Sequence, residues 1–334
     1  MSVDIHYCGG GEIGEAMTFI ERHWKQGHIL AHDLRLMDFL HRNPEGNYNI
    51  VLAGRGDDIT GFLGVIPVSH FDPALTPEKD TWLAVWKNVG GPGDGLALFQ
   101  EATARFETVG SIGINAKVAK LYKVLGFQLG ELEQYYIPNE KTETFRIAVL
   151  PPGEYAGPPK EAELVMLSPR EMAASGVEGY YHPLKSLTYF ENRYVKHPYY
   201  RYLFAGVREP GEKSCRGIIV IRPININGSR CLRIVDVLGD MDSWGSIGGA
   251  VRQLLEQTGA EYIDCLNYGI PEGVFRRHGF RKVDGDHVIP NYFEPFVREN
   301  VSIKLAILNR KNVPYVVFKG DSDQDRPNQI PGGN

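Results

Sequence analysis

Residues 81–127 decide the fold, and they read TWLAVWKNVGGPGDGLALFQEATARFETVGSIGINAKVAKLYKVLGF. The segment 82–89 is mostly apolar and predicts a strand, which leads into a turn that is rich in glycine. Residues 96–106 then have the apolar spacing of a helix. A second strand and a second helix follow before Gly126-Phe127. The stretch therefore predicts a compact strand, turn, helix, strand and helix unit around which the rest of the chain is arranged.

The glycine-rich turn between Val89 and Leu96 is predicted to bind an anion. Glycines let the backbone come close to a ligand, and the free N–H groups at a helix start favour negative charge because the helix dipole is positive there. A pyrophosphate suits such a turn. The alternative is an ordinary connection between strand and helix, with Tyr122 as a packed core aromatic.

This stretch resembles the GNAT superfamily of acyl-CoA-dependent N-acyltransferases, whose pyrophosphate loop follows a Gln/Arg-x-x-Gly-x-Gly/Ala pattern. Gly93-Asp94-Gly95 match the last three positions, whereas Gly90 stands where Gln or Arg is usual. Backbone N–H groups would therefore have to supply more of the phosphate contacts. The later segment 115–127 resembles the family's next strand–helix unit, and there Tyr122 matches the tyrosine that in many members protonates the departing CoA thiolate.

The resemblance also implies where the acyl-CoA binds. In the family, the strand before the loop splays from its neighbour, and its backbone groups pair with the pantetheine and orient the thioester carbonyl. The acyl group would then lie near residues 84–86, although the two tryptophans of this strand equally fit plain core packing. The predicted cofactor-binding residues are Ala84, Val85, Trp86, Val89, Gly91, Gly93, Asp94, Gly95, Leu96 and Asn115.

Composition limits the class of protein. A chain of 334 residues suggests two domains, and 43% hydrophobic, 11% aromatic and 23% charged residues are typical of a soluble globular protein. The net charge of -5, without a run of Lys or Arg, argues against nucleic acid or a membrane surface as a partner. We find neither an apolar run of membrane-spanning length nor a signal peptide, so we expect a cytoplasmic protein. The 4 cysteines form no C-x-x-C pair, and we expect no metal.

The N-terminal region has two interpretations. Residues 9–14 match the dinucleotide fingerprint G-x-G-x-x-G, and Asp33 follows about 20 residues later. However, the preceding strand is half polar and Glu12 would put a charge beside a pyrophosphate, so we expect the first strand and helix of an acyltransferase domain instead. A helix is predicted over 28–42, on which His28 either contacts the acceptor amine or belongs to a solvated polar face.

The composition of the chain changes near residue 150. The sequence LPPGEYAGPP, rich in proline and glycine, predicts a linker over 150–162. We expect one domain over 1–149, a second over 163–318 and a disordered tail over 319–334. The order of predicted elements recurs in the second domain. The expected fold is therefore α/β (α+β), with two tandem GNAT-like domains that each have a mixed, largely antiparallel sheet flanked by helices.

The second copy has lost features of the first. Asn267 occupies the position that corresponds to Asn115, but Phe275 occupies the position that corresponds to Tyr122. The loop 239–245 carries two carboxylates, which would repel a pyrophosphate. The first domain is therefore expected to bind CoA, and the second either braces the fold or supplies an acceptor site at the domain interface.

Residues 180–202 interleave aromatic side chains with cations, which suits a flat base and a diphosphate, although a Tyr-rich core is the alternative. With the pattern ENRYVKHP at 191–198, the chain resembles the tandem GNAT enzymes that acylate nucleotide-linked amino sugars, notably the dTDP-3-amino-3,6-dideoxyhexose (Fuc3N/Qui3N type) N-acyltransferases of surface-polysaccharide synthesis. This resemblance implies acetyl-CoA or 3-hydroxybutyryl-CoA as co-substrate. The predicted substrate-binding residues are Tyr181, Lys185, Arg193, His197 and Asp240.

The expected reaction is direct attack of the sugar amine on the thioester, with a backbone N–H holding the oxyanion and Tyr122 as general acid. Asp236, His28 and Asp240 are candidates for the base, and water is an equal alternative. Two other functions stay open: a non-catalytic acyl-CoA-binding or scaffold protein, and a carrier-dependent peptide aminoacyltransferase. The lack of a basic surface argues against a tRNA carrier.

Overall fold

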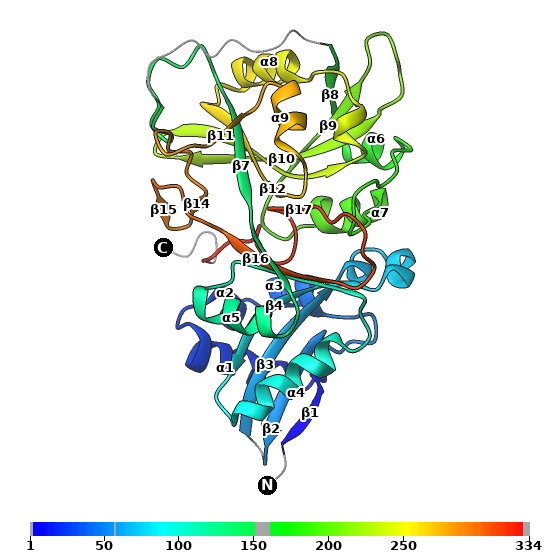
Figure 1. Ribbon diagram of the computed structural model, residues 1–334, viewed down its shortest axis with the longest axis vertical. Coiled ribbons are helices and arrows are strands. Elements are labelled where there is room, and N and C mark those ends of the chain that lie inside the picture. Colours follow the sequence, from blue (N-terminus) through cyan, green and yellow to red (C-terminus); the bar gives the residue numbers. More distant parts are fainter. Residues whose placement is uncertain (1–2, 57, 151–160, 330–334) are drawn as a thin grey trace.

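The computed structural model describes residues 3–56, 58–150 and 161–329, which form two lobes stacked along the long axis of the molecule (Figure 1). The first lobe has a seven-stranded sheet in the order β1-β2-β3-β4-β5-β16-β6. Its neighbouring strands are antiparallel except for β4 and β5, which are parallel. The strands are β1 (Asp4–Tyr7), β2 (Ile50–Arg55), β3 (Asp58–Pro67), β4 (Asp80–Asn88), β5 (Thr108–Ile112), β16 (Lys304–Asn309) and β6 (Gln128–Glu131).

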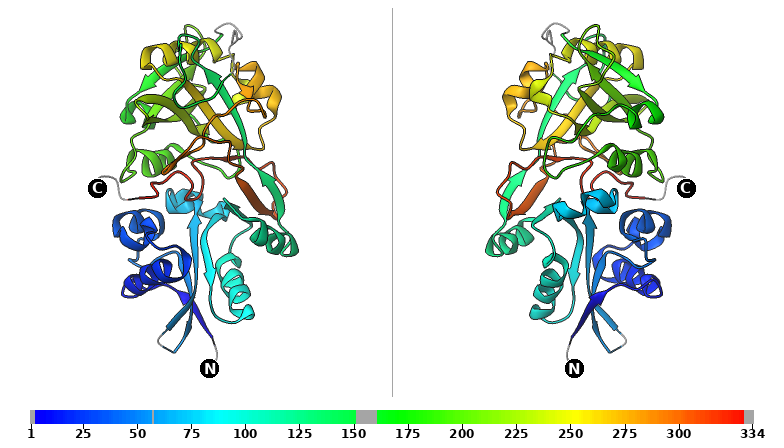
Figure 2. Two further views of the ribbon diagram at one scale, coloured as in Figure 1. Left: turned by 90° about the vertical axis from the view of Figure 1, so that its left-hand side faces the viewer. Right: turned by 90° about the vertical axis from the view of Figure 1, so that its right-hand side faces the viewer.

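Helices cover both faces of this first sheet (Figure 2). Because side chains alternate along a strand, Ile50 and Leu52 of β2 pack with the helices of one face, and Val51 and Ala53 pack with those of the other. One face carries α1 (Ile13–Phe19), η1 (Ile20–Trp24), α2 (Ile29–His32) and α3 (Leu34–His41), and the other carries α4 (Pro92–Thr103) and α5 (Ala116–Val124). The turns η2 (Val68–His70) and η3 (Pro73–Glu78) connect β3 to β4.

The second lobe has an eight-stranded sheet in the order β13-β7-β12-β11-β10-β9-β8, with β17 paired to β12. Its strands are β13 (Arg281–Lys282), β7 (Glu133–Pro138), β12 (Tyr262–Tyr268), β11 (Ser229–Leu238), β10 (Gly217–Ile226), β9 (Leu203–Arg208), β8 (Glu163–Leu167) and β17 (Val317–Phe318). Its helices are α6 (Pro169–Ala173), α7 (Leu187–Phe190), η4 (Glu191–Val195), η5 (Met241–Ser243), α8 (Gly248–Thr258) and α9 (Glu272–Arg277). A small hairpin of β14 (Tyr292–Phe293) and β15 (Phe296–Val297) lies beside it.

The two sheets repeat one order of strands. β8 to β11 are antiparallel neighbours and β11 pairs in parallel with β12, just as β1 to β4 are antiparallel and β4 pairs in parallel with β5. α8 follows β11 in the way that α4 follows β4. This repetition confirms the predicted fold class of two tandem, largely antiparallel mixed sheets flanked by helices. No helix among the described residues has both the length and the apolar character needed to cross a lipid bilayer.

Each lobe lends one strand to the other, which the sequence did not predict. β6 and β7 are separated only by Leu132, yet β6 joins the first sheet and β7 joins the second, between β12 and β13. In return, β16 of the second half lies between β5 and β6 of the first sheet. The expected division into 1–149 and 163–318 therefore does not separate the two sheets, because backbone pairing crosses it in both directions. Most of the expected linker, residues 151–160, lies outside the described residues.

The N-terminal region is not a dinucleotide fold. β1 is an edge strand that pairs antiparallel with β2, and the Glu12 carboxylate accepts a hydrogen bond from the Gly9 N–H at 2.7 Å. The helix expected over 28–42 is divided into α2 and α3 at Asp33, whose side chain caps α3 by accepting from the Leu36 N–H.

The expected disordered tail over 319–334 is wrong for residues 319–329, which run between the two lobes as a segment that we call the C-terminal segment (Figure 2). Asp321 is fully buried, and Asp325 is 2% exposed. The physical reason is that side chains of the second lobe bind this polar segment. Arg193 donates to the carbonyl oxygens of Gly320 and Ser322, and Lys185 lies 2.8 Å from Asp321.

Candidate functional site

A gap in strand pairing opens in the first sheet between β4 and β5. The two strands are paired in parallel from Asp80–Thr108 as far as Leu83–Ser111. β4 continues to Asn88, whereas the chain after β5 turns towards β16, because the N–H groups of Gly113 and Ile114 donate to the carbonyl oxygen of Lys304. We call the part of β4 beyond Leu83 that is not paired with β5 the first-lobe slot.

A β-bulge at Val85 lies at the beginning of this slot. Leu63 pairs with Trp86 and Gly64 pairs with Ala84, so that Val85 is left out of the ladder between β3 and β4. Val85 has φ 47°, which is unfavourable for a β-branched residue and marks a strained backbone. Gly64 permits this geometry, because a Cβ there would lie 2.6 Å from the carbonyl oxygen of Ala84. Bulges of this kind are frequent beside active sites.

The glycine-rich turn follows β4 and begins α4, with Gly91 at the N-cap. The Asp94 carboxylate accepts from the Gly91 N–H at 2.9 Å and is paired with the Arg55 guanidinium at 2.9 Å. Gly90 is explained by the same contact, since a Cβ there would lie 2.4 Å from Asp94 Oδ2. Sequence analysis missed Arg55, which comes from the end of β2 and brings a cation to a loop that lacks the usual Gln or Arg.

The predicted cofactor residues lie along one continuous path. Ala84, Val85 and Trp86 belong to β4, Val89 and Gly91 to the turn, and Gly93 to Leu96 to the first part of α4. Asn115 caps α5, because its side chain accepts from the N–H groups of Lys117 and Val118 at 2.9 and 3.0 Å. The cap fixes the start of the helix that carries Tyr122.

Tyr122 lies beneath the end of the paired part of β4 and β5. Its ring packs against Trp86 and Phe127, with centroid distances of 5.7 and 4.7 Å. Burial raises the pKa of Tyr122 to about 12, and a hydrogen bond with Ser111 acts in the opposite direction. The phenol is therefore protonated at neutral pH, and it is linked to the strand residue at which the slot opens.

The second lobe repeats the slot but fills it with the chain itself. β11 and β12 are paired from Leu232–Ile263 to Ile234–Cys265, and Val235 is left out of the ladder by a register shift, as Val85 is in the first lobe. Beyond this point β17 pairs with β12, and Gly320 donates its N–H to the carbonyl oxygen of Val235 at 2.7 Å. Phe275, in the place of Tyr122, is stacked on Tyr135 of the exchanged strand β7 at 4.1 Å.

Two of the predicted substrate-binding residues, Lys185 and Arg193, contact the C-terminal segment. Lys185 is 2.7 Å from Asp236 and 2.8 Å from Asp321; burial acts to lower its pKa, but the two carboxylates raise it above the usual value. Asp236 also accepts from Tyr194 at 2.5 Å, so its contacts are all in the second lobe. With Arg193 on the backbone of Gly320 and Ser322, these side chains hold the chain's own segment.

The other predicted residues lie apart from this group. Tyr181 accepts from the Met241 N–H and donates to Asp240 in the turn of η5. His197 accepts from the N–H groups of Tyr199 and Tyr200, and burial lowers its pKa to about 3. His28 caps α2 in the first lobe; its Nε2 is 3.1 Å from Arg326 of the C-terminal segment, and burial lowers its pKa to about 4.

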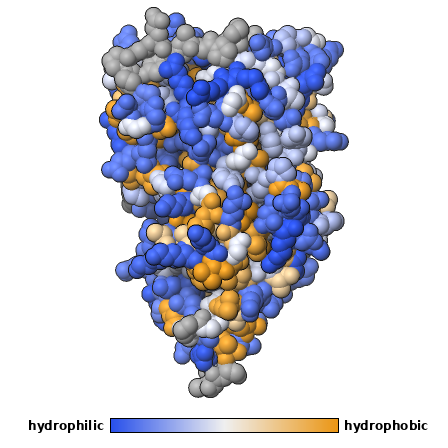
Figure 3. Space-filling model, in the orientation of Figure 1, coloured by the Kyte–Doolittle hydropathy of each residue, from blue (hydrophilic) through white to orange (hydrophobic). Residues whose placement is uncertain are grey.

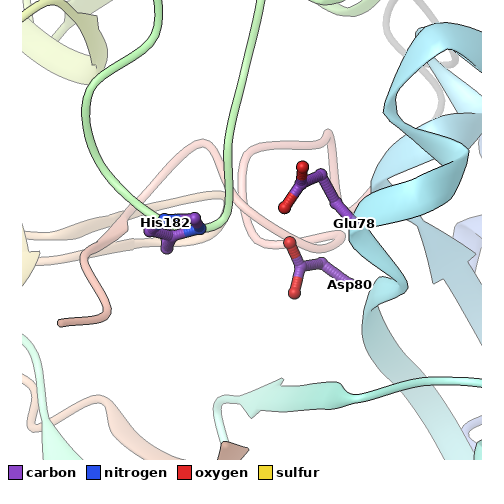
Figure 4. Close-up of side chains that lie close together, drawn as sticks. All are labelled: Glu78, Asp80 and His182. Atoms are coloured by element: carbon purple, nitrogen blue, oxygen red, sulfur yellow. The ribbon is translucent and has the colours of Figure 1, made fainter. Parts of the chain in front are cut away.

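Glu78, Asp80 and His182 form a separate cluster whose possible ligand atoms lie within 4.8 Å of one another (Figure 4). The Lys311 ammonium lies 3.1 Å from Glu78 and 3.1 Å from Asp80, so a cation of the protein pairs with both carboxylates and offsets one of their two negative charges. The cluster joins η3, β4 and the loop of His182, and its chemistry is that of a structural ion pair.

No protein-family model and no curated protein matches the sequence. Solved structures of similar shape do exist. A probable N-acyltransferase from Enterococcus faecalis matches 93% of this chain and 74% of its own, with a TM-score of 0.55 and 9% identity. GCN5-related N-acetyltransferases from Kribbella flavida and Anabaena variabilis match with TM-scores of 0.52 and 0.51 at 10% and 11% identity, and each covers 92% of this chain and 70% and 72% of its own. The chain therefore has the fold of the GCN5-related N-acetyltransferases.

Proposed function

We propose that the chain is an acyl-CoA-dependent N-acyltransferase whose first lobe holds the acyl-CoA. The observation that carries this proposal is the combination of three features in one lobe: the slot beyond Leu83 and Ser111, the bulge at Val85 and the glycine-rich turn at the start of α4. The second lobe has the same strand arrangement, but β17 and Gly320 fill its slot. One acyl-CoA per chain is therefore expected.

The groups of the first lobe divide the binding of acyl-CoA among them. The backbone N–H groups of the turn, with Arg55 beside them, would hold the pyrophosphate. Residues 84–89 would pair with the pantetheine, and the backbone at Val85 would polarise the thioester carbonyl. Apolar side chains gather on the face of the first lobe that is seen in Figure 3. Leu121 and Val124 of α5 are 44% and 84% exposed. Apolar side chains of this face would pack on the pantetheine.

The proposed chemistry is a direct transfer. As the acceptor amine attacks the carbonyl carbon, a C–N bond forms and the C–S bond breaks, and the Tyr122 phenol gives its proton to the thiolate. The high pKa of the buried phenol keeps that proton in place at neutral pH. Asp236 is engaged by Lys185 and Tyr194 in the second lobe, and His28 is buried beside Arg326, so we assign removal of the amine proton to water.

The acceptor proposed is a nucleotide-linked amino sugar such as a dTDP-3-amino-3,6-dideoxyhexose. Lys185 and Arg193 no longer support it, because the C-terminal segment occupies them. Support comes instead from a small cavity between the second lobe and the C-terminal segment, whose polar lining includes aromatic rings and cations such as Tyr200 and Arg222.

The test is release of free thiol from a panel of acyl-CoAs, each with and without amino acceptors that include dTDP-linked amino sugars. Release that depends on both substrates supports the proposal and identifies the pair. If CoA binds but no amine supports release, the proposed activity is wrong. If no CoA binds at all, the assignment of the first-lobe slot is wrong as well.

A second candidate is a non-catalytic acyl-CoA-responsive protein. It is favoured by one observation: Gly90 stands where the resembling family has Gln or Arg, so the loop lacks one side-chain phosphate contact. Calorimetric titration with CoA combined with the thiol-release assay separates the candidates, because this protein would bind CoA without releasing thiol in the presence of any amine.

A further inference from the structure

The cavity between the second lobe and the C-terminal segment has an unusual lining. Its volume is about 120 Å³, and it is formed by Arg222 of β10, Arg233 of β11, the hairpin residues 291–294 and side chains of the C-terminal segment. This space has room for one carboxylate or one phosphate group. The cavity can therefore hold a charged group of a ligand.

Lys319 is the cation in this lining that the protein leaves unpaired. Its side chain is 5% exposed, and within the described residues no carboxylate lies at ion-pairing distance from its ammonium. The ammonium lies 5.6 Å from the centroid of the Tyr292 ring. A buried ammonium without an anionic partner is costly, and such groups are retained where they serve a ligand.

The neighbouring arginines add to the positive potential. Arg222 is 9% exposed, and it pairs with Asp325 through Nη1 at 3.2 Å, but its Nε is buried and has no hydrogen-bond partner among the described residues. All three side-chain nitrogens of Arg233 donate hydrogen bonds, either to Asp264 or to backbone carbonyl oxygens. Burial lowers the pKa of Lys319 to about 7, and Arg233 acts in the same direction. A bound anion would offset both effects.

The carboxylates near the cavity already have partners. Asp323 is paired with Arg326 at 3.1 Å, and Glu294 accepts from the Tyr200 hydroxyl and from the Asn328 N–H. Asp325 accepts from Tyr202 and pairs with Arg222. The Lys319 ammonium thus remains for a ligand, and the Arg222 guanidinium adds positive charge beside it.

The cavity is linked to the first-lobe slot through one side chain. Gln324 lines the cavity, and its amide donates to the carbonyl oxygen of Ile112 at 3.1 Å. Ile112 is the residue after Ser111, at which β4 and β5 separate. The Gln324 side chain therefore lies between the cavity and the end of the paired part of β4 and β5.

We propose that this cavity is an anion subsite, in which Lys319, beside the positive charge of Arg222, binds a carboxylate or phosphate group of the amine acceptor. The assignment to the acceptor rests on the proposed acyltransferase function, whereas the anion subsite itself does not. The predicted acceptor class is thus an amine that carries an oxyanion, which a nucleotide-linked sugar satisfies through a phosphate and an amino acid through its carboxylate.

The test uses the full chain, with inorganic phosphate and then acetate as probes at constant ionic strength set with chloride. We expect phosphate to raise the Tm of the wild type and to leave the Tm of Lys319→Met unchanged. In chloride alone Lys319→Met should melt higher than the wild type, because it removes a buried unpaired charge, so loss of the phosphate effect cannot be ascribed to unfolding. The control is Lys196→Met, whose side chain is 61% exposed and which should respond to phosphate as the wild type does.

The second measurement is the KM for amines with and without an oxyanion. Loss of one charge-assisted contact should raise the KM for oxyanion-bearing amines by about tenfold to 100-fold in Lys319→Met, with the KM for acyl-CoA unchanged. Phosphorylated and carboxylated amines separate the two sources of the anion. Equal phosphate effects in the wild type and Lys319→Met would overturn the subsite. A phosphate effect that depends on Lys319, without acyl transfer to any amine, would keep the subsite and overturn the proposed function.

Discussion

Gly320 donates its backbone N–H to the carbonyl oxygen of Val235 at 2.7 Å, at the bulge of β11 that corresponds to the Val85 bulge of β4. The chain therefore uses its own backbone at the position where the first lobe leaves a strand free. This contact makes the two repeats different in function although they are alike in strand order. It leads to a prediction about stoichiometry and to one about stability.

Because β17 and Gly320 occupy this position in the second lobe, we expect calorimetric titration to find one CoA per chain. Gly320→Ala should lower the free energy of unfolding by about 1–3 kcal/mol, since a Cβ would lie 2.4 Å from the Tyr194 hydroxyl and 2.6 Å from the Val235 carbonyl oxygen. Gly273→Ala in α9 is the matched control, because a Cβ there meets nothing within 4 Å and alanine favours a helix. Urea unfolding measures both; equal effects would argue against tight packing at Gly320.

Tyr122→Phe should lower kcat by about 100-fold with little change in the affinity for CoA, because the phenol acts only on the leaving thiolate. Since burial raises the pKa of this phenol to about 12, the acid form persists throughout the range from pH 7 to 10 and causes no loss of activity there. Steady-state kinetics across that range provide the check. Tyr180→Phe, at an exposed tyrosine, is the control, and a Tyr122→Phe enzyme with full kcat would remove Tyr122 from the chemistry.

The unit at 81–127 could be predicted because its signals are local. The strand, the glycine turn and the two helices correspond to β4, α4, β5 and α5, although α4 begins at Pro92, before the expected start at residue 96. The repetition of this pattern and the loss of Tyr122 at Phe275 could be read for the same reason.

The strand exchange and the buried C-terminal segment could not be predicted locally. Residues 304–309 fit either sheet by composition, and only the three-dimensional register places β16 beside β5. The polar segment 319–329 has the composition of a disordered tail, but partners more than a hundred positions away, such as Arg193, order it. Valine, a β-branched residue, disfavours the positive φ of Val85. The bulge could therefore not be predicted from the sequence.

Gly64→Ala tests the bulge at Val85. The new Cβ would lie 2.6 Å from the backbone oxygen of Ala84, so β4 would have to shift and the slot would change shape. We expect CoA affinity to fall at least about tenfold while the circular dichroism spectrum stays native. Gly54→Ala in β2 is the control, because its Cβ would meet only the Asp58 oxygen, at 3.8 Å. Equal CoA affinity in both variants would contradict a role of the bulge in binding.

His41 makes stability depend on pH. It is fully packed beneath β3, with Nδ1 3.2 Å from the Val65 carbonyl oxygen, and burial lowers its pKa to about 4. In the unfolded chain the imidazole takes up a proton as the pH falls through about 6.5, whereas in the folded protein it does so only near 4. Its contribution to the free energy of unfolding is therefore complete above about pH 7 and is lost progressively as the pH falls from 6.5 to 4.

Urea unfolding at pH 7 and at pH 4.5 measures this contribution. The difference in the free energy of unfolding between the two pH values should be about 2–3 kcal/mol smaller in His41→Gln than in the wild type. The exposed His23 provides the control variant His23→Gln, which should keep the wild-type difference; if His41→Gln keeps it too, His41 is not the group that titrates.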